Sequence, residues 1–318
     1  MKKKVAIIFG VTGQDGSYLA YELIKKNYEI IGITKNRKTQ NLKRLNIINK
    51  IKLIKFDYRN YPKLIKIFKK KHFDEIFFLA GETSVKKSEF VPYESIISNT
   101  MVCLYILEYI RSQKRKIKFF NASSGEIFGG VETNKKKSSE NSPYEPKSFY
   151  ALSKVISLEI IKSYRNQFNI WACSGIFFNH ESPLRSKGFV IKKIIDKAKL
   201  IKRNKKLKLN IGNIHISRDW GWAPDYVDAI IKIIRRNNPS DFVISTGRST
   251  KLKKVIKIVF SYYGLDYKKF TKVNKKLFRK NEILNSIGNS NKAKKVLPWK
   301  PKTNIEKILK NIIEERLF

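Results

Sequence analysis

The sequence predicts an α/β protein in which a doubly wound parallel sheet is followed by a smaller C-terminal α/β unit. Short runs rich in Val, Ile and Phe alternate with longer helical stretches through roughly the first half of the chain. The short runs are apolar throughout, which is typical of parallel strands covered by helices on both faces. The length of 318 residues suits about two domains.

Each element of the larger part follows from this alternation. The run Val5–Phe9 is continuously apolar and predicts the first strand. Further β-branched runs predict strands at residues 29–33, 51–56, 75–79, 117–121 and 171–177. The longer amphipathic stretches between them predict helices at residues 17–27, 61–70, 95–113 and 149–167.

The regular alternation ends after residue 178. Residues 179–188 contain Pro183 and Gly188 and predict a loop. The remaining elements expected are a basic helix at 189–203, a strand at 207–211, a helix at 225–236, a strand at 242–245 that returns to the main sheet, and a helix at 304–316.

Composition excludes several classes of protein. Hydrophobic residues make up 42% of the chain, which excludes disorder over most of its length. No apolar run reaches the roughly 18 residues of a membrane span. Cys103 and Cys173 lie in apolar runs and predict buried thiols, and no Cys/His cluster has the spacing of a metal site. The basic start followed by a short apolar run lacks a cleavage site, so we expect a cytoplasmic protein.

The net charge of +42 comes from 68 Lys and Arg against 26 Asp and Glu. Such a charge attracts nucleic acid, anionic membranes or phosphate-rich ligands. It is also what a lysine-rich but ordinary solvated surface would carry. Because the lysines are spread along the whole chain, the second interpretation is favoured, and we expect neither a specific nucleic-acid partner nor a membrane partner.

A glycine-rich motif, Gly10-Val-Thr-Gly13-Gln-Asp-Gly16, joins the first strand to the first helix. Glycines let the backbone approach a pyrophosphate, and the helix N-terminus offers free N–H groups to the phosphates. The motif therefore predicts a Rossmann-type dinucleotide site, and an ordinary strand–helix turn is the alternative. The candidate cofactor residues in it are Gly10, Thr12, Gly13, Gln14, Asp15 and Gly16.

The end of the second strand bears on the choice of cofactor. It carries Lys35 and Arg37 and no acidic residue that could accept hydrogen bonds from the ribose of NAD. The two cations suit a 2′-phosphate and favour NADP, although they also belong to a very large set of surface cations. Asp57, after the third strand, is placed either to contact adenine or to cap the next helix.

A candidate catalytic group follows in Tyr150-Ala-Leu-Ser-Lys154. A spacing of four residues places the phenol and the ammonium on one face of a helix. A neighbouring cation lowers the pKa of a tyrosine, which would make Tyr150 a base. Ser124 and Glu126 follow the preceding strand, at the sheet edge where ligands bind in such folds.

With these motifs together, the sequence resembles the nucleotide-sugar branch of the extended short-chain dehydrogenase/reductases, and within it the GDP-mannose 4,6-dehydratases. The resemblance rests on residues 10–20, 122–129 and 150–154, on Phe178-Asn-His-Glu-Ser-Pro183, and on Arg218-Asp-Trp-Gly221 with Asp225-Tyr-Val. It implies dehydration of GDP-D-mannose to GDP-4-dehydro-6-deoxy-D-mannose, with hydride passing through bound NADP.

The resemblance also implies individual roles. Tyr150, Lys154 and Ser124 would remove the 4-hydroxyl proton, and Glu126 would remove the C5 proton. Besides the glycine motif, the implied cofactor residues are Lys35, Arg37, Asp57, Tyr58, Leu79, Ala80, Gly81, Tyr150, Lys154, His180 and Arg185. The implied substrate residues are Thr83, Ser84, Ser124, Asn179, Lys193 and Arg218. For His180 a structural role in a turn is the alternative, and for Lys193 a solvated helix face.

The resemblance further implies a domain division and an assembly. Residues 1–180, joined by 215–247, would form the NADP-binding Rossmann domain, and 181–214 with 248–318 the substrate domain. The long helices at 95–113 and 149–167 would pair with those of another copy, giving a homodimer or homotetramer.

Departures from the family pattern leave the sugar open. Glu82 places a carboxylate near the expected sugar pocket, and Trp222 replaces a histidine. These two residues suggest GDP-manno-heptose as an alternative substrate. An epimerase or reductase acting on a nucleotide sugar is a further alternative, because it would need Tyr150 and Lys154 but not Glu126.

Overall fold

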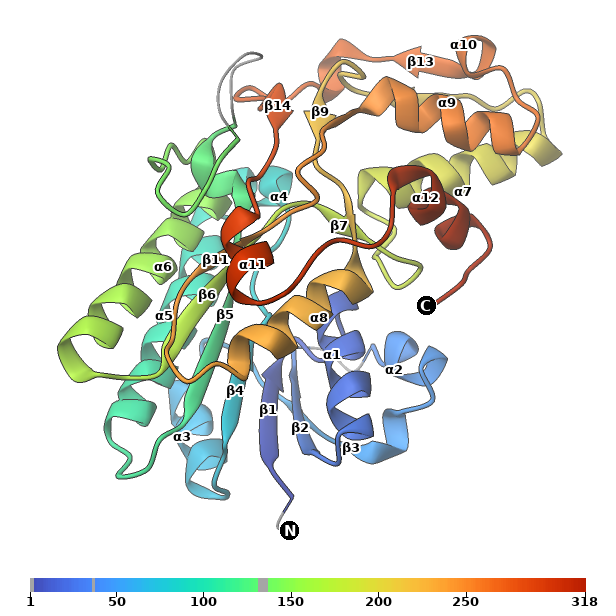
Figure 1. Ribbon diagram of the computed structural model, residues 1–318. Helices are drawn as coiled ribbons and strands as arrows, with labels where there is room; N and C mark the ends of the chain where they lie inside the picture. Colours follow the sequence, from blue (N-terminus) through green and yellow to red (C-terminus); the bar gives the residue numbers. More distant parts are fainter. Residues whose placement is uncertain (1–2, 36–37, 131–136) are drawn as a thin grey trace.

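The computed structural model describes residues 3–35, 38–130 and 137–318, and its main feature is a seven-stranded sheet (Figure 1). The strand order is β3-β2-β1-β4-β5-β6-β11, and every neighbouring pair is parallel. This order confirms the predicted Rossmann-type doubly wound sheet and the return of the 242–245 strand to it. The strands are β1 (Val5–Phe9), β2 (Glu29–Thr34), β3 (Ile51–Lys55), β4 (Glu75–Phe78), β5 (Lys118–Ser124), β6 (Ala172–Phe177) and β11 (Phe242–Ile244).

Helices cover both faces of this sheet, as its apolar strands require (Figure 1). One face packs against α1 (Gln14–Lys25), α2 (Gln40–Arg44) and α8 (Ala223–Ile234). The other packs against α3 (Tyr61–Lys69), α5 (Pro92–Arg111) and α6 (Phe149–Phe168). Alternate side chains of β1 divide between the two cores: Ala6 and Ile8 join the first, and Ile7 and Phe9 the second.

A separate apolar core holds together the C-terminal elements at the top of Figure 1. It is formed by α7 (Val190–Arg203), α9 (Leu252–Tyr262) and α12 (Ile305–Ile313). Short strands complete this region: β8 (Leu209–Ile211), β9 (Ser217–Arg218), β12 (Thr250–Lys251), β13 (Thr271–Val273) and β14 (Asn285–Ser286). Two short helices, α10 (Tyr267–Phe270) and α11 (Asn291–Val296), lie in the same part of the chain.

The chain passes repeatedly between the sheet and this C-terminal region. β7 (His180–Glu181) pairs with β10 (Gly221–Trp222) at the crossing, and α8 and β11 then rejoin the sheet. Asp219 fastens the crossing, because its carboxylate accepts hydrogen bonds from Thr246 N (2.9 Å), Thr246 Oγ1 (2.5 Å) and Gly247 N (2.8 Å). The side chain is fully buried, so these donors replace the water that it lost.

Several elements differ from the sequence prediction. The structure contains α2, α4 (Val85–Phe90) and α9, for which no element was expected, and β7 lies inside the expected loop. The suggestion that Asp57 caps the next helix is wrong: Asn60 caps α3, and Asp57 pairs with Arg59 at 2.7 Å. Both cysteines are buried as predicted. Among the helices of the described residues, none combines the length and apolarity that a bilayer span needs.

Candidate functional site

The turn between β1 and α1 has the geometry of a phosphate cradle. Gly10 has a φ of +82°, and its N–H donates to Ile33 O at 2.9 Å, which binds the turn to β2. A Cβ at Gly16 would lie 2.2 Å from Gly10 O, a distance that side chains do not tolerate. The glycines therefore let α1 start against the turn, with its free N–H groups facing the place a pyrophosphate would occupy.

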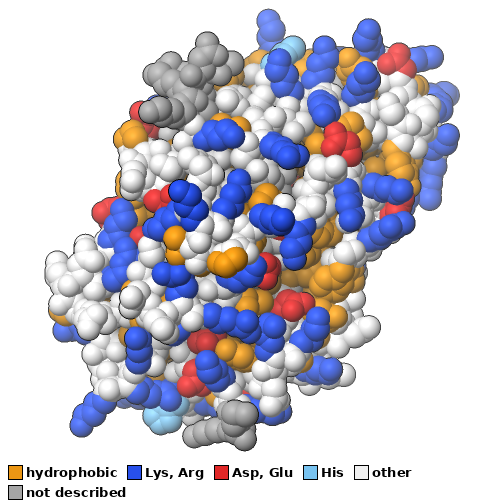
Figure 2. Space-filling model, viewed as in Figure 1, with side chains coloured by type: hydrophobic (Ala, Val, Ile, Leu, Met, Phe, Trp, Pro, Cys, Tyr) orange, Lys and Arg blue, Asp and Glu red, His pale blue; other side chains and the backbone are white. Residues whose placement is uncertain are grey.

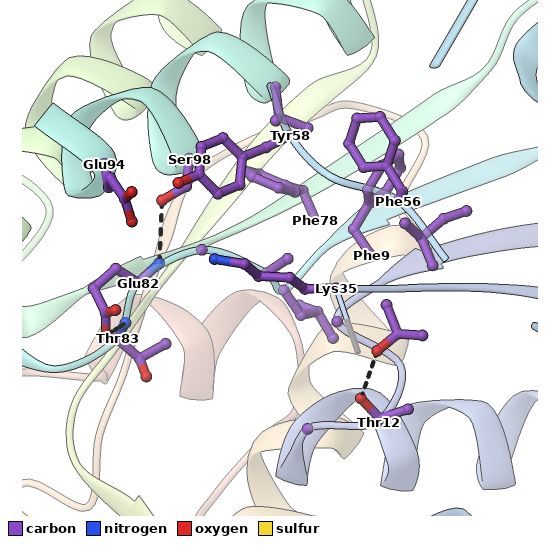
Figure 3. A pocket seen from close by; sticks show the side chains of 18 of the residues that line it. Phe9, Thr12, Lys35, Phe56, Tyr58, Phe78, Glu82, Thr83, Glu94 and Ser98 are labelled. Carbon is purple, nitrogen blue, oxygen red and sulfur yellow. Dashed lines mark hydrogen bonds between the residues drawn. The ribbon is translucent and has the colours of Figure 1, made fainter. Parts of the chain in front are cut away.

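A cavity of about 350 Å³ extends from this turn along the carboxyl ends of β1, β2 and β4. Figure 3 shows Lys35 reaching across it, between Thr12 on one side and Glu82 and Ser98 on the other. The predicted cofactor residues that line it are Gly10, Thr12, Gly13, Lys35, Tyr58, Leu79, Ala80 and Gly81. The shape and the glycine cradle fit a dinucleotide. Arg37 lies outside the described residues.

A buried polar network lies beneath the glycine turn. His180 Nε2 is 2.9 Å from both carboxylate oxygens of Asp15, and His180 Nδ1 is 2.8 Å from Phe178 O. Gln14 donates to His180 O at 3.2 Å and accepts from Ser182 at 2.8 Å. Burial raises the pKa of the Asp15 carboxyl, but attraction to His180 and Arg185 outweighs it and the net pKa is lowered. Both ring nitrogens of His180 thus serve to hold the turn.

Arg185 lies close to the same network. Its guanidinium stacks on Phe189 at 3.6 Å, and its Nε is 3.7 Å from the Glu181 carboxylate. Glu181 is 2% exposed, and burial raises its pKa despite the attraction of Arg185. The positive charge of Arg185 lowers the pKa of both Asp15 and Tyr150, against the opposing effect of burial on Tyr150.

The predicted catalytic side chains meet at the carboxyl end of β5. Ser148 caps α6 by accepting from Ala151 N at 3.1 Å, which places Tyr150 in the first turn of the helix. The Tyr150 side chain hydrogen-bonds with that of Ser124. One turn further on, Lys154 Nζ lies 5.9 Å from the Tyr150 ring centre and donates to Ala122 O at 2.9 Å. The sheet end and the helix start therefore hold the three groups together.

The expectation that Lys154 lowers the pKa of Tyr150 is wrong for the protein without bound cofactor or substrate. Burial raises the pKa of Tyr150 to about 12, and the Ser124 hydrogen bond opposes this only in part. The Lys154 charge was expected to lower it, but burial also lowers the pKa of Lys154, to about 8. Both shifts favour the neutral forms, because a site closed to water stabilises charge poorly.

Glu126 lies beside this group and is electrostatically coupled to both Tyr150 and Arg218. Its backbone N–H donates to Ser124 Oγ at 3.3 Å, so the two side chains leave the same tight turn after β5. Arg218 is 5% exposed and donates to Ile283 O at 2.7 Å and to Glu282 at 3.3 Å. A carboxylate, a phenol and a buried guanidinium therefore share one site.

The other predicted substrate residues have no described hydrogen bond or ion pair with Tyr150, Ser124 or Glu126. Lys193 is exposed on α7, in agreement with a solvated helix face. Asn179 accepts from Gly221 N at 2.8 Å through its backbone. Thr83 lines the cofactor cavity, and Ser84 caps α4 by accepting from Lys87 N at 3.1 Å.

The two departures that suggested another sugar have structural roles. The Glu82 carboxylate accepts from Thr83 N and Ser84 N at 3.1 and 3.0 Å and pairs with Lys87 at 2.6 Å, so it holds the start of α4. Trp222 is 4% exposed and belongs to the C-terminal core. Both side chains therefore have structural partners, and the heptose alternative stays a prediction that these contacts do not test.

Some supporting residues were missed by sequence reasoning. Asn41 donates to Thr12 O and to Leu184 O, both at 3.1 Å, and so joins the glycine turn to the loop after β7. Ser88 Oγ accepts from Tyr150 N at 3.2 Å. Asn99 donates to Glu82 O at 3.3 Å and to Ser95 O at 2.9 Å, which ties α5 to the cavity wall. These contacts join distant segments, so no local pattern indicates them.

Comparison with known proteins agrees with this geometry. The sequence model of the GDP-mannose 4,6 dehydratase family matches residues 7–312. GDP-mannose 4,6 dehydratase 1 of Arabidopsis thaliana is 37% identical over 99% of this chain and 90% of its own. The structure of DesIV, a dTDP-glucose 4,6-dehydratase from Streptomyces venezuelae with NAD bound, superimposes with a TM-score of 0.86 at 18% identity, over 98% of this chain and 96% of that one. The Thermotoga maritima UDP-glucose 4-epimerase gives the same TM-score at 22% identity, over 98% and 97%. The chain belongs to the GDP-mannose 4,6-dehydratase family.

Proposed function

We propose that this protein removes water from GDP-D-mannose and releases GDP-4-dehydro-6-deoxy-D-mannose. The observation that carries the proposal is the placement of Glu126 beside Tyr150 and Ser124 at the carboxyl end of β5. Oxidation of a sugar hydroxyl needs only the phenol, its hydrogen-bond partner and the ammonium. Elimination of water needs a further acid–base group, and Glu126 supplies it.

The first half of the reaction depends on Tyr150. A bound nicotinamide cofactor would supply the hydride chemistry, taking up hydride from C4 of the sugar and giving it back at C6. Tyr150 takes the proton of the 4-hydroxyl, and Ser124 orients that hydroxyl through the hydrogen bond it now makes with the phenol. Lys154, fixed to Ala122 O, supplies the positive charge that stabilises the phenolate as it forms.

The second half depends on Glu126. The C4 ketone acidifies the C5 proton, which the Glu126 carboxylate removes. Glu126 then passes that proton to the C6 hydroxyl, which leaves as water. The resulting C5–C6 double bond would accept hydride at C6 from the bound cofactor, while Tyr150 would return to C5 the proton that it took from the 4-hydroxyl. The sugar loses one water, and the cofactor ends in the oxidation state in which it began.

We assign the cofactor as NADP. Lys35 supports this choice, because its ammonium reaches into the cavity at the end of β2, where a ribose 2′-phosphate would lie (Figure 3). Asp57, which would contact the adenine, precedes the lining residue Tyr58 and pairs with Arg59. His180 and Arg185 would support the pyrophosphate and nicotinamide end, His180 by holding Asp15 and Arg185 by direct charge.

We assign the substrate's GDP moiety to the C-terminal unit. Arg218 supports this assignment, because it is a buried guanidinium coupled to Glu126 and suited to bidentate phosphate contact. Asn179 and Lys193 would contact the diphosphate from the same side, and Thr83 and Ser84 would contact the sugar. The sheet with its helices would then be the cofactor domain, and the α7, α9 and α12 region the substrate domain.

We also propose that two copies pair through α5 and α6. Aromatic side chains are exposed at this edge, including Phe90 and Tyr93, which are 74% and 70% exposed. Phe149 and Leu152 at the start of α6 add to the same apolar surface. Analytical ultracentrifugation should give at least a dimer, and Phe90→Ser with Tyr93→Ser should shift it toward the monomer. A wild-type monomer at micromolar concentration would refute this pairing.

The Glu126→Gln variant tests the proposed reaction. Gln keeps the size of the side chain but cannot accept the C5 proton. With GDP-mannose, the variant should therefore oxidise C4 and stop, which leaves bound NADPH that absorbs at 340 nm. Mass spectrometry should show no loss of water from the sugar nucleotide. Wild-type turnover by Glu126→Gln would show that another group removes the C5 proton.

A further inference from the structure

A second concave surface lies apart from the cofactor cavity, and we call it the basic groove. It lies between residues 246–250, which follow β11, and residues 298–307, which lead from α11 into α12. Its volume is about 1140 Å³, and it shares no lining residue with the cofactor cavity. Figure 2 shows Lys and Arg side chains gathered over the middle of this face, where the segment between α11 and α12 crosses in Figure 1.

Unpaired cations surround the basic groove. Five exposed side chains on its lining have no hydrogen-bond or ion-pair partner for their charged groups among the described residues: Arg248, Lys294, Lys300, Lys302 and Lys307. Among the described lining residues, Glu306 is the only carboxylate, and Lys254 pairs with it at 3.0 Å. The groove therefore holds a large uncompensated positive charge, and concave walls concentrate such a field.

One uncharged feature adds to this field. Residues 304–307 on the lining form the N-terminus of α12, whose helix dipole places partial positive charge at the groove. The Asn304 side chain already accepts from Lys307 N at 2.9 Å, so an anion here would be attracted by the dipole and the cations rather than held by a set of free N–H groups.

We propose that the basic groove binds a small molecule that carries several phosphate charges, such as a nucleoside di- or triphosphate, at a site separate from the active site. The cations come from three separate segments and converge on one concavity, whereas a nucleic-acid surface would present them in an extended stripe. The volume slightly exceeds the range of about 300–1,000 Å³ that is usual for small-molecule sites, so it can hold a nucleotide.

Calorimetric titration with sodium tripolyphosphate tests this proposal. The protein is first saturated with NADPH, so that the glycine turn is filled. The groove variant carries Arg248→Gln, Lys300→Gln and Lys307→Gln. The control variant carries Lys63→Gln, Lys66→Gln and Lys70→Gln, three exposed cations in and just after α3, which lose the same total charge far from the groove. Melting temperature and NADPH affinity show that both variants are folded.

The groove variant should bind tripolyphosphate about tenfold more weakly, because each exposed ion pair contributes a factor of about two to five in affinity. The control variant should bind within about twofold of the wild type. An equal loss in both variants would show general attraction to a polycation and overturn the proposal, as would the absence of binding by the wild type. Tighter, groove-dependent binding of a duplex oligonucleotide would overturn the assignment to a small molecule. If the triple variant is unstable, Lys300→Gln alone with a salt titration gives the same discrimination.

Discussion

The Gly16→Ala substitution tests whether the glycine turn positions the cofactor. The new Cβ would lie 2.2 Å from Gly10 O and 2.8 Å from Val11 Cα, whereas real Cβ contacts are rarely below 3.0 Å. The turn must therefore move by about 0.8 Å, and a misplacement of about 1 Å at a binding or reacting group costs on the order of a hundredfold. Overpacking of this kind also destabilises a protein by about 1–3 kcal/mol.

We expect the dissociation constant for NADPH to rise by about a hundredfold, measured from NADPH fluorescence on binding. Gly188→Ala is the matched control, because nothing lies within 4 Å of the Cβ that it adds. The control should bind NADPH as the wild type does. If Gly16→Ala binds NADPH within twofold of the wild type while remaining folded, the turn does not support the pyrophosphate and our account of the cradle is wrong.

The remaining predictions concern single charged residues. Lys35→Glu should weaken NADPH binding by at least about tenfold and leave NADH binding little changed. Lys52→Glu makes the same charge change at an exposed position of β3 and should affect the binding of neither cofactor. Equal losses for both cofactors would refute the selection of NADP by Lys35. Lys154→Met should abolish turnover. It should also raise the free energy of unfolding at pH 7 by on the order of 1 kcal/mol, because it removes a buried charge. Burial disfavours that charge in the folded protein and holds the pKa of Lys154 at about 8, below its ordinary 10.5. Between pH 8 and 10.5 Lys154 is protonated in the unfolded chain but neutral in the folded protein, so the free energy of unfolding of the wild type rises over this range. The difference in unfolding free energy between the variant and the wild type, measured by urea titration, should therefore disappear as the pH approaches 10.5. Asp219→Ala should lower the unfolding free energy by about 3 kcal/mol, because it leaves buried hydrogen-bond donors unpaired. The control Asp228→Ala breaks only a surface ion pair with Lys232 and should lower the unfolding free energy by less than about 1 kcal/mol.

The parts of the fold that sequence predicts are those governed by local pattern. The apolar runs of β1 and β6 and the glycine turn are recognisable from short stretches of sequence. General rules for α/β folds then give the parallel sheet and place the cofactor at the carboxyl ends of its strands. α9 was missed although Leu252, Val255, Ile256, Val259 and Phe260 recur at helical spacing and are all buried. Its apolar spacing is as regular as that of the more basic α7, which was predicted, so the residues themselves indicate this helix.

The parts that sequence does not predict depend on distant contacts. The spacing of Tyr150 and Lys154 is local, but the pKa of Tyr150 is set by burial beneath other segments, which no spacing reports. Glu82 illustrates the same limit. It was expected beside the sugar; its carboxylate lines the cofactor cavity, and its hydrogen bonds to Thr83 N and Ser84 N give it a structural role that its position in the sequence does not indicate.

The repeated crossing of the chain between the sheet and the C-terminal region has a practical consequence for dissecting this protein. A fragment that ends at Phe178 would lack β11, so β6 would become a bare sheet edge open to pairing with other chains. It would also lack α8, and the apolar side of α1 that packs there, including Tyr18, would face water. The part of the protein built on the seven-stranded sheet is therefore contiguous in space but not in sequence. Limited proteolysis between the sheet and the C-terminal region should yield cleaved chains that stay associated. Neither the sheet with its helices nor the C-terminal region should be obtainable as a soluble product of a truncated gene.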